Sequence, residues 1–80
     1  MRKSIPQTHY ATLRKLLKEC RLSEGLRQVD LARRLKKEQN YVSRYERGDR
    51  RLDVLELREI CSALGVGVIE FMRRLERSLK

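Results

Sequence analysis

Apolar residues in this chain recur with the period of an α-helix. Spacings of three and four residues place side chains on one face of a helix. Two segments carry such stripes: Leu13, Leu16, Leu17 and Cys20 in the first, and Leu57, Ile60, Cys61 and Leu64 in the second. No segment shows the alternation of a β-strand. Because a helix must bury its stripe against other elements, these 80 residues are predicted to form one all-α domain.

Turn and capping residues divide the chain into five short helices. The predicted helices run from Thr8, as N-cap, to about Leu22, and then over residues 28–35, 39–47, 54–64 and 68–79. The strongest boundary signal surrounds Asp53, an N-cap to which Glu56 can reach back. Leu52 can then pack against Leu57, and Gly48 is predicted to end the third helix in a C-cap.

The charge of the chain points to a polyanionic partner. A net charge of +9 on 80 residues favours nucleic acid first and an anionic membrane second, with a merely solubilising surface as the alternative. No apolar run is long enough to span a bilayer or to serve as a targeting segment, so a cytoplasmic protein is expected. Two distant cysteines and one histidine give no zinc spacing, and both cysteines are expected in the core.

The predicted third helix, residues 39–47, has two different sides. At about 100° per residue, one arc collects amides, a hydroxyl and guanidiniums: Gln39, Asn40, Ser43, Arg44 and Arg47. Val42 and Tyr45 lie on the opposite side and are predicted to be core residues. The position of Tyr41 suits either partial burial in the core or contact with a partner, and Glu46 lies at the edge of the polar arc. Arginine can read guanine, and Asn or Gln can read adenine, in the major groove of DNA.

The segment around this helix is strongly basic. Residues 33–51 carry eight basic side chains against three acids, which gives +5 in 19 residues. A polar helix with an aromatic underside, surrounded by lysine and arginine, is typical of a probe for the major groove.

Several short motifs then resemble a known family. They are the Gly-Leu-x-Gln entry at 25–28, the Leu-Ala pair at 31–32, Tyr-Val-Ser-x-Tyr-Glu-x-Gly at 41–48 and Ala-Leu-Gly-Val at 63–66. Over roughly residues 13–66 the chain resembles the helix-turn-helix domain of the phage repressor and Cro family, often called XRE-type. The resemblance implies an N-terminal arm at 1–8, a DNA-binding helix-turn-helix domain at 9–67 and a C-terminal helix at 68–80.

The resemblance also implies roles for individual residues on double-stranded DNA. Base edges are assigned to Gln39, Asn40 and Arg44; phosphate or groove-wall contacts to Gln28, Ser43, Arg47, Arg50 and Arg51; and a possible backbone contact to Tyr41. Glu46 is expected to pair with Arg21 and set the angle of the third helix. Lys36 stands where the family has a glycine, so a positive φ there would strain it. Arg27 and Glu38 replace the usual hydroxyl N-caps.

The last predicted helix favours a homodimer. Val68, Met72, Leu75 and Leu79 recur at coiled-coil-like spacing with Phe71 beside them, although the same stripe could instead close the chain's own core. The predicted function is a small dimeric transcriptional regulator, most simply a repressor at an inverted-repeat operator. Within this class, the sequence does not separate a DNA-binding antitoxin, a mobile-element repressor and a restriction-modification controller. The alternative outside it is a protein- or RNA-interaction module. No catalytic cluster, cofactor site or separate effector domain is expected.

Overall fold

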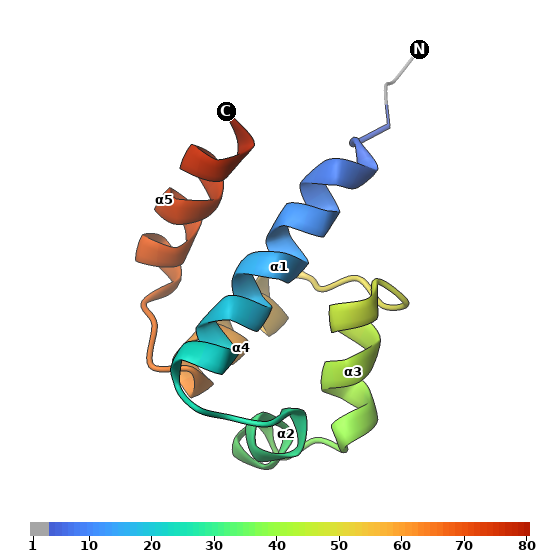
Figure 1. The fold of residues 1–80 in the computed structure, drawn as a ribbon, viewed down its shortest axis with the longest axis vertical. Coiled ribbons are helices and arrows are strands. Elements are labelled where there is room, and N and C mark those ends of the chain that lie inside the picture. Colours follow the sequence, from blue (N-terminus) through green and yellow to red (C-terminus); the bar gives the residue numbers. More distant parts are fainter. Residues whose placement is uncertain (1–3) are drawn as a thin grey trace.

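The computed structural model describes residues 4–80 as five α-helices joined by short turns. They are α1 (Gln7–Ser23), α2 (Gln28–Leu35), α3 (Gln39–Arg47), α4 (Val54–Ala63) and α5 (Val68–Leu79), as Figure 1 shows. The all-α prediction is confirmed, and α2, α3 and α5 have the predicted bounds. Residues 1–3 of the expected N-terminal arm lie outside the described part. Within residues 4–80, no helix is both long and apolar enough to cross a membrane.

Two predicted helix ends are wrong. Thr8 is not the N-cap of α1, because the helix already begins at Gln7 after Pro6, which makes no side-chain cap. A proline enters a helix readily, since its φ is preset and it has no N–H to satisfy. The Thr8 carbonyl instead accepts a hydrogen bond from the Thr12 hydroxyl at 2.9 Å. α4 ends one residue early, with Leu64 as its C-cap.

The capping signal of α4 is confirmed in both directions. The Glu56 N–H donates to Asp53 Oδ1 at 2.7 Å, and the Asp53 N–H donates to Glu56 Oε1 at 2.9 Å. Two backbone N–H groups at the helix N-terminus are satisfied in this way. Leu52 is half-buried and packs against the core cluster that contains Leu57. The start of α4 is therefore determined locally.

The N-termini of α2 and α3 lack the usual side-chain cap, as predicted. Neither Arg27 nor Glu38 accepts a capping hydrogen bond. At α2 the deficit is partly offset by Asp30, whose carboxylate accepts from the Arg27 N–H at 2.8 Å and from its guanidinium at 3.0 Å. These bonds to Arg27 lower the pKa of Asp30 to about 2. Lys36 ends α2 in the left-handed region, with φ 57° and ψ 42°, so the expected positive φ is confirmed.

The core draws side chains from all five helices. α1 packs between α3 and α5, and α2 packs against both α3 and α4 (Figure 1). The largest fully buried side chains are Tyr45, Phe71, Leu17, Leu31, Ile60, Leu64, Val42 and Cys61. The predicted core positions Val42 and Tyr45 are confirmed. Both cysteines are buried free thiols, as expected, and burial raises the pKa of Cys61 to about 11.

The predicted seam of α5 divides between two faces. Phe71 is fully buried, and Val68 and Leu75 are half-buried against the core cluster. Met72 remains 44% exposed, beside Ile69 at 67%. Val68 and Leu75 therefore contribute to the chain's own core, as in the alternative given for this stripe, whereas Met72 lies on the outer face of α5.

Candidate nucleic-acid interface

A buried ion pair anchors α3 to α1, and its arginine also bonds the turn before α2. Arg21 of α1 donates from Nε to Glu46 Oε2 at 2.8 Å and from Nη2 to Oε1 at 3.0 Å. The two side chains are only 7% and 4% exposed. Arg21 also donates to the Leu26 carbonyl at 2.8 Å, in the turn before α2. The predicted pair is confirmed, and it ties α1, α3 and the entry to α2 together.

The same carboxylate orients a predicted contact residue. Gln28 at the start of α2 donates from Nε2 to Glu46 Oε1 at 2.9 Å. Gln39 at the start of α3 donates to Gln28 Oε1 at 3.5 Å, the outer limit of a hydrogen bond. The N-termini of α2 and α3 are thus brought side by side, with Glu46 behind them.

The polar arc of α3 faces outward. Gln39, Asn40, Arg44 and Arg47 are exposed, and Ser43 is half-buried. The Arg47 guanidinium donates to Asp49 at 3.0 Å and to the Ser43 hydroxyl at 3.1 Å. Among the described residues, the Arg44 side chain makes no hydrogen bond or ion pair. Arg44 is therefore the guanidinium on this face that no intramolecular acid holds.

Tyr41 lies between the core and the polar arc. Its half-buried ring meets Tyr45 edge-on, with ring centroids 5.8 Å apart. Two cations flank it: the Lys37 ammonium at 5.3 Å and the Arg50 guanidinium at 4.8 Å from the ring centroid. Burial is the main cause that raises the pKa of Tyr41, followed by the charge of Glu56. The ring therefore stays a neutral phenol that supports the surrounding basic surface.

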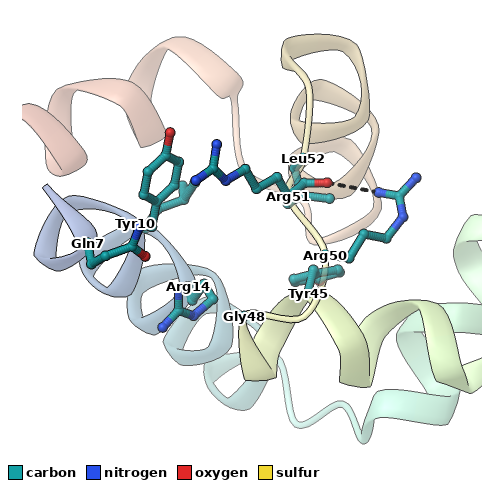
Figure 2. Close-up of a pocket in the computed structure, with 9 residues that line it drawn as sticks. Gln7, Tyr10, Arg14, Tyr45, Gly48, Arg50, Arg51 and Leu52 are labelled. Carbon is teal, nitrogen blue, oxygen red and sulfur yellow. Dashed lines mark hydrogen bonds between the residues drawn. The ribbon is translucent and has the colours of Figure 1, made fainter. Parts of the chain in front are cut away.

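The loop from α3 to α4 is fastened at two points. Arg50 donates to Glu56 at 2.6 Å and to the Arg51 carbonyl at 3.1 Å. The hydrogen bond with Arg50 lowers the pKa of Glu56 and keeps it ionised. Arg51 reaches the other way, toward α1, where its guanidinium lies 4.4 Å from the ring centroid of Tyr10 (Figure 2). The two loop arginines therefore point in different directions.

Sequence reasoning missed two residues of α1 beside this loop. They are Tyr10, whose ring contacts the Arg51 guanidinium, and Arg14, whose guanidinium lies against Gly48. Gly48 caps α3 with φ 88°, as predicted, and a Cβ there would stand 2.9 Å from Arg14 Cζ. No local pattern signals these contacts, since they join segments more than 30 residues apart. In the described part of the chain, no group of three potential metal ligands gathers.

The fold and this surface define the class of protein. A short α2, a tight turn and an α3 with an exposed polar face that carries no acid make a helix-turn-helix DNA-binding unit. The Helix-turn-helix family HTH_3 matches residues 17–71. The chain belongs to this family, of the XRE/Cro/C1 type, whose members are DNA-binding transcriptional regulators and not enzymes.

Two solved structures share nearly the whole fold. An XRE-family like protein from Pseudomonas syringae pv. tomato str. DC3000 is 35% identical, with a TM-score of 0.86 over 92% of this chain and 90% of that chain. The wild-type restriction-modification controller protein C.Esp1396I is 27% identical, with a TM-score of 0.82 over 96% of this chain and 97% of that chain. No curated protein matches the chain significantly.

Proposed function

We propose that this regulator is a homodimer that binds an inverted-repeat operator, with α3 of each protomer in the major groove. The observation that carries the proposal is the exposed face of α3. Gln39 and Asn40 offer amides at its N-terminus, and Arg44 offers an uncommitted guanidinium one turn later. Arg44 would read guanine, and the two amides would read adenine.

The remaining polar residues would position the helix on the sugar-phosphate backbone. Gln28 is already oriented by Glu46 and would donate its remaining N–H to a phosphate. Arg47 pairs with Asp49 as its one acidic partner among the described residues, and both side chains of this pair are 58% exposed. Because such a pair is worth at most about 1 kcal/mol, a phosphate can replace the carboxylate at little cost. Ser43 would move with Arg47, to which it is hydrogen-bonded.

The loop after α3 would form the second phosphate contact. Arg51 is exposed, and Arg50 is fixed by Glu56 beside the N-terminus of α4, where backbone N–H groups favour anions. Tyr41 would support this surface through its contact with the Arg50 guanidinium, and its hydroxyl would reach the backbone from the edge of the groove.

Dimerisation would use the outer face of α5, within the proposed C-terminal element at 68–80. Ile69 and Met72 are exposed there, and they line a shallow groove with Arg73, Glu76 and Arg77. One recognition helix reads only a few base pairs. Two helices related by a two-fold axis would read half-sites about 34 Å apart, one turn of B-DNA.

The simplest regulatory outcome is repression by occupation of an operator. Similarity to a restriction-modification controller protein over nearly the full length of both chains supports a controller-type regulator within this class. A DNA-binding antitoxin would present the same α3 surface. A controller-type regulator and an antitoxin would therefore contact DNA in the same way, and the antitoxin would in addition bind a toxin.

Selection from a random pool of DNA duplexes tests the proposal. Enrichment of an inverted repeat with half-sites about one helical turn apart is expected, with affinity measured at two salt concentrations. Binding that stays non-specific and disappears as salt rises would mean that the net charge of +9 explains it. The polar face of α3 would then belong to a protein or RNA partner.

A further inference from the structure

A small cavity lies where α1, the end of α3 and the following loop meet. Its volume is about 60 Å³, and its wall includes Arg14, Gly48, Arg50 and Arg51 (Figure 2). Three guanidinium-bearing residues and no acid line it. A cavity with walls of one charge sign favours an occupant of the opposite sign.

Two of the three arginines have no acidic partner. Arg50 is neutralised by Glu56 at 2.6 Å. Arg14 and Arg51 form no ion pair with any acid in residues 4–80. Their positions are nevertheless defined, since Arg51 stacks on Tyr10 and Arg14 occupies the space that a side chain at position 48 would need. The cavity is thus bordered by the guanidiniums of Arg14 and Arg51, which have defined positions and no neutralising acid among residues 4–80.

A buried phenol also forms part of the cavity wall. Tyr45 lines the same cavity and is 1% exposed, yet its hydroxyl is the buried side-chain atom of residues 4–80 without a hydrogen-bond partner. Burial raises the pKa of this phenol, so the group is neutral and can donate.

We propose that the cavity is a binding site for a tetrahedral oxyanion of the phosphate type. Its volume, about 60 Å³, suits roughly four to six water-sized atoms, and such an anion has four oxygens. The guanidiniums of Arg14 and Arg51 supply charge-assisted hydrogen bonds, and the Gln7 amide supplies a neutral one. Inorganic phosphate and a backbone phosphate of DNA share this chemistry.

The first experiment uses the whole chain without DNA. Inorganic phosphate is titrated at constant ionic strength, balanced with chloride, while Tm and the NMR signals of the arginine Nε–H groups are followed. A saturable rise in Tm, together with shifts of the Arg14 and Arg51 signals, is expected. A response no greater than that to chloride would overturn the proposal, because general screening would then account for it.

Matched variants locate the site. Arg14→Gln and Arg51→Gln should each weaken phosphate binding about tenfold, since each removes a charge-assisted hydrogen bond. Arg58→Gln removes the same charge from an exposed site on α4 away from the cavity and should bind phosphate as the wild type does. An equal loss in all three variants would refute the site. Circular dichroism at the titration temperature shows whether each variant is folded. If a variant is unfolded, the phosphate titration of the wild type still tests the proposal.

Competition with a DNA duplex distinguishes the two sources of the phosphate. If saturating phosphate weakens duplex binding more than chloride of equal ionic strength does, the cavity takes a DNA phosphate, and Arg14→Gln should abolish this difference. If duplex and phosphate bind together without interference, the ligand is a free oxyanion. Both results support the site. The oxyanion site and operator recognition are tested separately. The protein can bind phosphate in the absence of DNA even if duplex selection finds no operator, and it can bind an operator even if the phosphate titration shows no binding.

Discussion

Gln28 and Arg21 donate to the same oxygen of Glu46. The Gln28 amide lies 2.9 Å from Glu46 Oε1, and Arg21 Nη2 lies 3.0 Å from it. The ion pair that fixes α3 against α1 is therefore continuous with the residue proposed to meet the DNA backbone at the start of α2. We therefore expect stability and DNA affinity to be coupled through this carboxylate.

Glu46→Gln should weaken both properties. The substitution leaves the Arg21 guanidinium, whose side chain is 7% exposed, without an anionic partner. Breaking a buried pair costs roughly 3–5 kcal/mol, and we expect about 3 because glutamine still offers one acceptor. For a domain of this size, that loss lowers Tm by more than about 10 °C. Thermal denaturation and operator affinity at a temperature where the variant is folded measure the two effects.

Glu59→Gln is the matched control, since Glu59 is exposed on α4 and forms no ion pair within the described residues. It should change stability by no more than about 0.5 kcal/mol, which is about 2–4 °C in Tm for a domain of this size. Equal behaviour of the two variants would show that the Arg21–Glu46 pair contributes nothing specific.

Lys36→Gly should stabilise the fold. Lys36 adopts φ 57°, a left-handed conformation that costs a residue with a side chain about 1–2 kcal/mol. Part of this gain is offset by the greater flexibility of glycine in the unfolded chain, so a net gain of about 0.5–1 kcal/mol is expected. Urea unfolding should show the higher midpoint, whereas Lys37→Gly, at a residue without a positive φ, should lower it. A lower midpoint for Lys36→Gly would contradict the strain.

Arg44→Ala should relax sequence specificity. The residue is exposed and not engaged by an acid, so its loss should leave stability within about 0.5 kcal/mol of the wild type. Operator binding should weaken by about 1–3 kcal/mol, with loss of preference at one base pair. Arg47→Ala should instead weaken all sequences similarly and reduce the salt dependence. Unchanged selectivity of Arg44→Ala in a repeated duplex selection would remove Arg44 from base recognition.

Met72→Glu should produce a monomer. Met72 is 44% exposed beside Ile69 on the outer face of α5, so a charge there disrupts a two-fold contact and spares the core. Sedimentation equilibrium measures the mass. Leu22→Glu places the same charge at a residue that is 57% exposed on α1 and should leave the mass unchanged. Identical masses for wild type, Met72→Glu and Leu22→Glu would exclude α5 as the dimer contact.

Asp30 should make stability depend on pH in the acid range. Its pKa is lowered to about 2 in the folded chain from an ordinary value of 3.8, so its contribution is complete above about pH 4 and is lost as the pH falls toward 2. The Tm difference between wild type and Asp30→Ala should therefore be largest near neutral pH and shrink between pH 4 and 2. A difference that stays constant over this range would show that the Arg27–Asp30 contact is not responsible.

Local signals were sufficient for much of this fold. The start of α4 follows from Asp53 and Glu56, and the end of α3 follows from Gly48, because caps act over three or four residues. The polar arc of α3 follows from helix geometry alone. The Arg21–Glu46 pair was reached through family resemblance, since nothing local joins residues 25 positions apart.

Tertiary structure decided which partner each side chain takes. Three arginines of the segment 47–51 are indistinguishable in the sequence. In the structure, Arg47 pairs with Asp49, Arg50 pairs with Glu56, and Arg51 stacks on Tyr10. The stripe of α5 likewise divides between the core and the outer face according to where α1 and α4 lie. Such choices depend on distances between segments far apart in the chain. Periodicity and capping, which act within a few residues, contain no information about those distances.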